Sequence, residues 1–189
     1  MAKGFDPQVL TSAVIECIEE AVSKKGNLPS TEAPAVQAKE IDEYEERMRA
    51  SGIDKFNVPA YIAVVNLYLN QGDLQHHKAK GAIIVYLNTE VADKIFKALG
   101  YTIPYDEDDE AMLKLCGDFA QMVATHLKGR ITSSGYAELV LSPPSMYKNT
   151  VGAGVEFSPD QNESQEVIFS YLKHKAIAVE ITLAPLPRK

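Results

Sequence analysis

Asp118 and Gln121 are the two residues of this sequence whose types and spacing are best suited to chemistry. They lie one helical turn apart in residues 111–129, and therefore point to the same side of the predicted helix. A carboxylate can bind a cation and a carboxamide can orient a water molecule, so the pair could form a site for a partner protein. An ordinary solvated helix face is the alternative interpretation. The helix is indicated by apolar residues at three- and four-residue spacing on another side of it, namely Met112, Leu115, Cys116, Phe119, Met122, Val123 and His126.

Other residues with chemical potential are less suitable. His76 and His77 are adjacent in a predicted strand, so their side chains would face opposite ways and could not bind one ion together. His126 lies on the apolar stripe and is expected to be a core histidine. Residues 152–154 (Gly-Ala-Gly) lack the helix and the lysine of a phosphate-binding loop. We therefore expect no metal site and no cofactor of the protein's own, and no nucleophile of its own for a small-molecule substrate.

The residue pattern of the N-terminal part of the chain, up to residue 100, predicts one helix, two strands and a short helix. Asp6 and Pro7 are typical of a helix start, and the apolar periodicity continues to Lys24. Residues 60–69 and 74–87 are rich in aromatic and β-branched residues, and residues 70–73 between them are typical of a hairpin turn. A short helix over residues 90–99 is expected to end at Gly100.

Strands follow the 111–129 helix. Four are predicted, over residues 137–142, 150–158, 166–173 and 176–183, and proline-containing or tight turns separate them. Consecutive strands joined by short turns pair antiparallel. We therefore expect an α+β fold in which a largely antiparallel sheet carries the long helices on one face.

Residues 27–55 differ from the rest of the chain. Residues 27–38 are proline-containing and loop-like, whereas residues 39–50 are dense in charges, with acidic residues ahead of basic ones in a helical pattern. We interpret the segment as an insertion or a flexible charged arm within a single domain that spans residues 1–189. A simple solvated connection is the alternative.

Composition restricts the class of protein. The 189 residues are 46% hydrophobic and 24% charged, as in an ordinary globular protein. Cys17 and Cys116 both fall on apolar helix faces, which favours buried, reduced thiols. The net charge of −7 argues against a nucleic-acid partner, whose phosphates require a basic patch. Since the sequence shows neither a signal peptide nor an apolar run of about 20 residues, we expect a cytoplasmic protein without membrane contact.

The segment from Asp118 to Pro143 resembles the motif of the CheC/CheX/FliY chemotaxis phosphatases. That motif is Glu, two residues, Asn, 21 residues, Pro. Asp118 stands at the glutamate position, Gln121 at the asparagine position and Pro143 at the proline position. The surrounding text, LCGDFAQMVATHLKG and LVLSPPS, is also similar to CheX. The sequence has one copy of the motif, as CheX does.

The resemblance implies a function and a partner. Members of this family hydrolyse the aspartyl phosphate of the response regulator CheY, which itself brings the divalent metal, Mg²⁺, and a lysine. By resemblance, Asp118 engages that lysine and Gln121 positions the attacking water. This assignment agrees with the chemistry of phosphoryl transfer, which depends on positioning and charge stabilisation. The resemblance to CheX further implies a homodimer.

Both motif residues depart from the family pattern. The acid is one methylene shorter and the amide one methylene longer, which moves each head group by roughly an ångström. CheZ, an unrelated chemotaxis phosphatase, uses an Asp and a Gln in these roles. Two further hypotheses stay open: a non-catalytic CheX-like adaptor that binds a receiver domain or another signalling protein, and a structural dimer module whose exposed sheet edge pairs with a partner strand.

Overall fold

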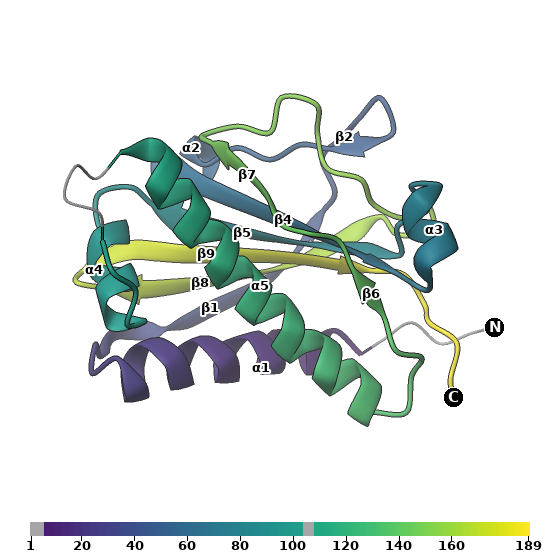
Figure 1. Ribbon diagram of the computed structural model, residues 1–189, viewed down its shortest axis with the longest axis horizontal. Coiled ribbons are helices and arrows are strands. Elements are labelled where there is room, and N and C mark those ends of the chain that lie inside the picture. Colours follow the sequence, from purple (N-terminus) through teal and green to yellow (C-terminus); the bar gives the residue numbers. More distant parts are fainter. Residues whose placement is uncertain (1–5, 104–107) are drawn as a thin grey trace.

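The computed structural model describes residues 6–103 and 108–189. Its main element is an antiparallel sheet of seven strands within these ranges, in the order β1-β8-β9-β5-β4-β6, with β7 also paired to β4 (Figure 1). This arrangement confirms the predicted α+β class. The strands are β1 (Ser30–Glu40), β4 (Ala60–Tyr68), β5 (Gly81–Asn88), β6 (Val140–Leu141), β7 (Ser145–Lys148), β8 (Glu163–Tyr171) and β9 (His174–Leu183).

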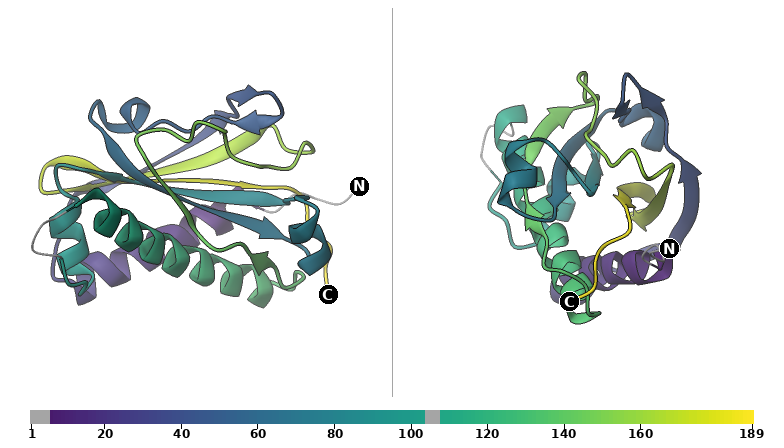
Figure 2. Two further views of the ribbon diagram at one scale, coloured as in Figure 1. Left: turned by 45° about the horizontal axis from the view of Figure 1, so that its top comes forward. Right: turned by 90° about the vertical axis from the view of Figure 1, so that its right-hand side faces the viewer.

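The long helices lie together on one face of the sheet. These are α1 (Pro7–Ile18), which continues as the π-helical segment η1 (Glu19–Lys25), and α5 (Asp109–Ser133) (Figures 1 and 2). The Asp6 side chain caps α1 by accepting a hydrogen bond from the Gln8 amide, as the sequence predicted. The helices α2 (Ile53–Phe56), α3 (Gln71–Gln75) and α4 (Ala92–Ala98) are short. In the described ranges, no helix combines the length and the apolar character that a membrane span requires.

The central strands of the sheet are buried on both faces. Alternate residues of β4 divide between two cores: Ala63 and Val65 pack under the helices, whereas Ile62 and Val64 face the other side. There the cover is a layer of two segments (Figure 2), the hairpin β2 (Glu43–Tyr44) and β3 (Arg47–Met48) together with residues 149–158. Removing apolar surface from water on both sides stabilises the sheet, which explains why its central strands are almost continuously apolar.

The charged segment does not form the helix that its pattern suggested. Residues 30–40 form β1, paired antiparallel with β8, and residues 43–48 form the hairpin of β2 and β3. Helical charge pairs contribute only about 0.2–0.5 kcal/mol each. Strand pairing and the burial of Met48, which is 2% exposed, outweigh them. That residues 27–55 are an insertion stays a prediction.

One predicted hairpin turn and one predicted strand also differ from the structure. Residues 70–73 begin α3 instead of a hairpin, because the Asn70 side chain caps that helix by accepting from the Asp73 amide at 2.8 Å. Residues 150–158 contain only isolated bridges, Thr150 with Ser51 and Val155 with Met48. Their apolar side chains pack against the sheet face, so this segment is buried without forming a regular strand.

The two cysteines lie where the sequence predicted. Cys17 on α1 and Cys116 on α5 are free thiols, and both are buried in the core between the helices and the sheet. Burial raises the pKa of Cys17 to about 11 and raises that of Cys116 further, because a thiolate would lose its solvation there. At neutral pH both behave as small apolar side chains.

Candidate functional site

The N-terminus of α5 is fixed to the sheet by polar contacts. Asp108 caps the helix by accepting from the Ala111 amide at 2.7 Å. Asp109 accepts from the Tyr61 hydroxyl on β4 at 3.1 Å and from Lys148 Nζ on β7 at 2.6 Å. The hydrogen bond from Lys148 holds the pKa of Asp109 below its usual value. These contacts fix where α5 begins, and thereby the position of every later turn. Asp106 and Glu107, which precede the cap, lie outside the described residues.

Small residues let α5 approach the sheet edge closely. A Cβ on Gly117 would stand 2.8 Å from Met146 Sδ on β7, so a larger residue would need Met146 to move. The apolar stripe of α5 is buried as predicted at Met112, Cys116, Phe119 and Val123. Leu115 and Met122 are only half-buried, because they lie at the border of the stripe. The helical turn of α5 that carries Asp118 therefore packs directly against β7.

Asp118 and Gln121 project from the same side of α5, away from the sheet. Asp118 is exposed, as predicted, whereas Gln121 is half-buried. Within residues 6–103 and 108–189, no basic side chain pairs with Asp118. Its charge reaches Tyr101, whose pKa is raised mainly by burial and further by the Asp118 carboxylate. The site therefore offers an uncompensated carboxylate beside a carboxamide, which suits a cationic group and a water molecule brought by a partner.

A groove of about 290 Å³ lies between the N-terminal helical segment and α5, and Met122, the residue after Gln121, lines it. Met122 and His126 line it from α5, Glu16 and Cys17 line it from α1, and Glu20 lines it from η1. His126 Nε2 lies 3.9 Å from Glu16 Oε2, and the His126 side chain is 34% exposed. The prediction of a core histidine was therefore wrong, since the stripe turns outward at this position to meet α1.

Pro143 and the histidines of residues 76–77 lie apart from the helical side. Pro143 is exposed between β6 and β7. His76 ends α3, and His77 has a left-handed backbone with φ of 53°, so neither lies on a strand as predicted. His77 Nδ1 lies 3.7 Å from Glu156 Oε2. Among the described residues, no three His, Cys, Asp or Glu side chains gather as a metal site would require.

A buried charge network lies on the sheet face opposite the long helices, and the sequence did not predict it. It is formed by Lys55, Glu166 and Glu180. The available signal was Glu180 inside the apolar run 176–183 and Glu166 directly before the apolar residues 167–169, because a charged residue in a buried strand requires a partner. The identity of that partner, Lys55, more than 100 residues away in the chain, carries no local signal.

Comparison with known proteins identifies the architecture. Neither protein-family models nor curated protein sequences match the chain. A CheC-like superfamily protein from Shewanella sp. PV-4 is similar in structure, with a TM-score of 0.61, 14% identity, and coverage of 92% of this chain and 96% of that one. CheX of Borrelia burgdorferi, in a complex with CheY, BeF3 and Mg, has a TM-score of 0.58 at 14% identity, covering 95% and 98%.

FliY of Thermotoga maritima is similar over 95% of this chain and 91% of its own, with a TM-score of 0.52 and 10% identity. The structural similarity to each of these three proteins thus extends over more than nine-tenths of this chain. The sheet order, the pair of long helices on one face and this coverage lead to one conclusion: the chain has the fold of the CheC/CheX/FliY chemotaxis proteins.

Proposed function

We propose that this protein hydrolyses the aspartyl phosphate of a CheY-like response regulator in the cytoplasm. The observation that carries the proposal is the pair Asp118 and Gln121, one turn apart on the outward side of α5 in a CheX-type fold. The Borrelia CheX that shares this fold forms a complex with CheY, which supports a receiver domain as the class of partner.

The reaction needs only positioning from this chain. The regulator supplies the aspartyl phosphate, Mg²⁺ and a lysine. Asp118 pairs with that lysine, and Gln121 holds a water in line with the phosphorus. The water oxygen forms a bond to phosphorus while the bond from the aspartyl oxygen breaks, which leaves a carboxylate on the regulator and releases inorganic phosphate. Because Gln121 does not ionise, it orients the water without becoming a nucleophile itself.

Partial burial of Gln121 supports its assigned role. A glutamine is one methylene longer than the asparagine of the family motif, and a freely mobile side chain would pay more conformational entropy to hold a water. Gln121 is half-buried, and partial burial lowers the number of conformations open to its side chain. Asp118, which only has to meet a lysine from the partner, is exposed.

The experiment is phosphate release from phosphorylated receiver domains, with and without this protein. Gln121→Ala should abolish the acceleration, since it removes the amide from a helix that alanine favours. Thr125→Ala is the matched control, because Thr125 is exposed one turn further along the same side. Equal loss in both variants would point to a damaged docking surface, and no acceleration by the wild type would rule out the enzyme.

A non-catalytic adaptor is the second candidate, favoured by the departure of both motif residues from Glu and Asn. In that case the protein binds receiver domains with the same face of α5, and Gln121→Ala leaves phosphate release unchanged. A homodimer is proposed for either function. The outer edge of β1, an 11-residue edge strand exposed along most of its length, is the surface available for pairing.

A further inference from the structure

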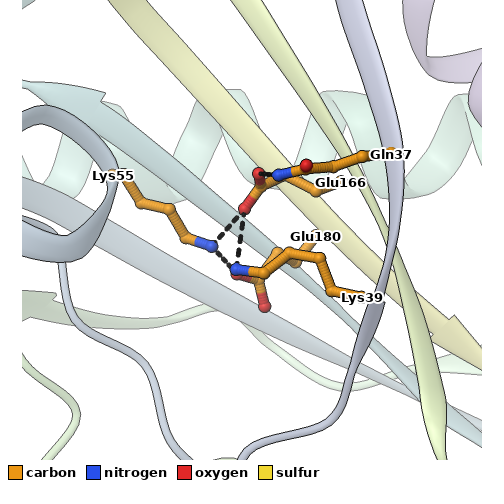
Figure 3. A network of polar contacts seen from close by, with 5 residues as sticks. All are labelled: Gln37, Lys39, Lys55, Glu166 and Glu180. Carbon is orange, nitrogen blue, oxygen red and sulfur yellow. Dashed lines mark hydrogen bonds and ion pairs between the residues drawn. The ribbon is translucent and has the colours of Figure 1, made fainter.

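A network of charged side chains lies on the sheet face opposite the helices (Figure 3). Glu166 on β8 and Glu180 on β9 are directly opposite each other in the antiparallel register, and both are buried, at 2% and 6% exposure. Lys55 reaches down from α2 and donates to both carboxylates. One lysine from the covering layer therefore holds two buried acids that the sheet itself places side by side.

The edge strand β1 joins the same network. Gln37 Nε2 donates to Glu166 Oε1 at 2.5 Å. Lys39 Nζ lies 3.3 Å from Glu166 Oε2 and 3.9 Å from Glu180 Oε1. Figure 3 shows both side chains reaching from β1 toward the carboxylates. Two lysines face two glutamates, so their formal charges balance, and three separate parts of the fold meet in the network.

Apart from its backbone pairing with β8, little else fixes β1 in place. None of its residues is buried, Val36 is 49% exposed, and its pairing with β8 shifts register twice, around Glu32. A strand without an apolar face has a weakly specified register, because sliding it costs little burial. The contacts of Gln37 and Lys39 with Glu166 are thus the side-chain interactions that select one register.

We propose that the network is a latch that holds the edge strand β1 and the helix α2 on the sheet, with Lys55 as the side chain that closes it. Among the described residues, removing Lys55 would leave the two buried carboxylates with the Gln37 amide and with Lys39, which is 39% exposed, as the one remaining ion-pair partner. An uncompensated buried charge is relieved most easily by local opening, because opening readmits water. The edge strand would then separate from β8 and α2 would lift, while the helical side keeps its own core.

The surroundings of Lys55 favour a closed latch at neutral pH. Burial lowers the pKa of Lys55 to about 8, and Glu166 opposes that effect, so the ammonium stays protonated at pH 7. The Lys55 ammonium lies 5.1 Å from the Tyr86 ring centre on β5. A cavity of about 100 Å³ adjoins the latch, and Asp42, Arg49 and Asp54 line it with the lysines. It gives water a route to the carboxylates once the lysine withdraws.

Amide hydrogen exchange tests the latch. Lys55→Met should accelerate exchange in β1 and α2 by roughly 10²–10³-fold, the range expected when a buried pair is broken. Exchange in β4, β5 and α5 should change far less. Lys24→Met is the control, since it removes a lysine from the exposed pair with Glu20. Uniform acceleration of all elements, or none in β1, would overturn the proposal.

A second variant covers the case in which Lys55→Met does not fold. The triple variant Lys55→Met, Glu166→Gln, Glu180→Gln removes the two buried acids together with their lysine, so it should fold and regain most of the protection of β1. Lowering the pH from 8 to 5 should likewise slow β1 exchange in Lys55→Met relative to wild type, because its acids can then bind protons. If the triple variant exchanges like the single one, or pH has no differential effect, charge compensation is not what holds β1.

Discussion

Gly117 and Met146 lie so close that a single added carbon on the glycine would stand 2.8 Å from the methionine sulfur. The contact places β7 directly beside the turn of α5 that carries Asp118. Because Met146 is a flexible side chain at the sheet edge, 36% exposed, the contact can adapt to a small change but not to a large one.

Gly117→Ala should change the free energy of unfolding by less than about 1 kcal/mol, since the gain in helix propensity offsets the shift of Met146. Gly117→Val should cost about 2 kcal/mol through overpacking. Urea unfolding measures both. Adding Met146→Ala to Gly117→Val should recover part of the lost stability, whereas Met146→Ala alone should not stabilise the wild type. An equal change in the free energy of unfolding in both backgrounds would contradict the contact.

Restoring the family pattern tests whether this pair is adapted as a unit. Asp118→Glu with Gln121→Asn should retain or raise phosphate release from the cognate regulator. Either single change should lower it, because one head group then moves about an ångström without the other. Single-turnover kinetics with each variant separates the cases. Additive effects of the two changes would show that the residues act independently.

Asp118→Ala should weaken binding of a phosphorylated receiver domain more at low salt than at high salt. An exposed charge attracts its partner through solvent, and screening at 0.5 M salt removes most of that attraction. Binding isotherms at two salt concentrations provide the measurement. Lys114→Ala, exposed one turn earlier on the same helix, is the control and should not weaken binding in this way.

Stability should fall in acid partly through Glu166. Burial alone would raise its pKa, but the hydrogen bonds and charges of Lys55, Gln37 and Lys39 outweigh burial and lower it. A lowered folded-state pKa contributes stability that is complete above the unfolded value near 4.5 and is lost as pH falls through the folded value. Urea unfolding between pH 6 and 3 should show a shallower decline in Glu166→Gln than in Glu20→Gln, which alters an exposed acid.

A homodimer that pairs through β1 should dissociate when its exposed edge carries an added charge. Val36→Lys places a cation on an exposed position of the edge strand, where lysine opposes edge-to-edge pairing. Sedimentation equilibrium at micromolar concentration should give a dimer for wild type and a monomer for the variant. A monomeric wild type would rule the dimer out, and a dimeric variant would place the interface elsewhere.

Local pattern was sufficient where an element buries one continuous face. The periodicity around Phe119 predicted α5 and the outward direction of Asp118, and the run Ala176–Leu183 predicted most of β9. It failed for β1, whose residues bury no side chain and are held by partners from β8. The latch could not be predicted either, because Lys55 and Glu180 are 125 residues apart in the chain and only the tertiary fold brings them together.

The burial of both native thiols has a practical consequence for measuring partner docking on α5 and the opening of β1. Since Cys17 and Cys116 lie in the core with raised pKa values, maleimide reagents at pH 7 should react far faster with a cysteine introduced at the surface. A fluorophore attached at Thr125 would then report a partner docking on α5. One attached at Val36 would report the movement of β1, without any need to remove the natural cysteines.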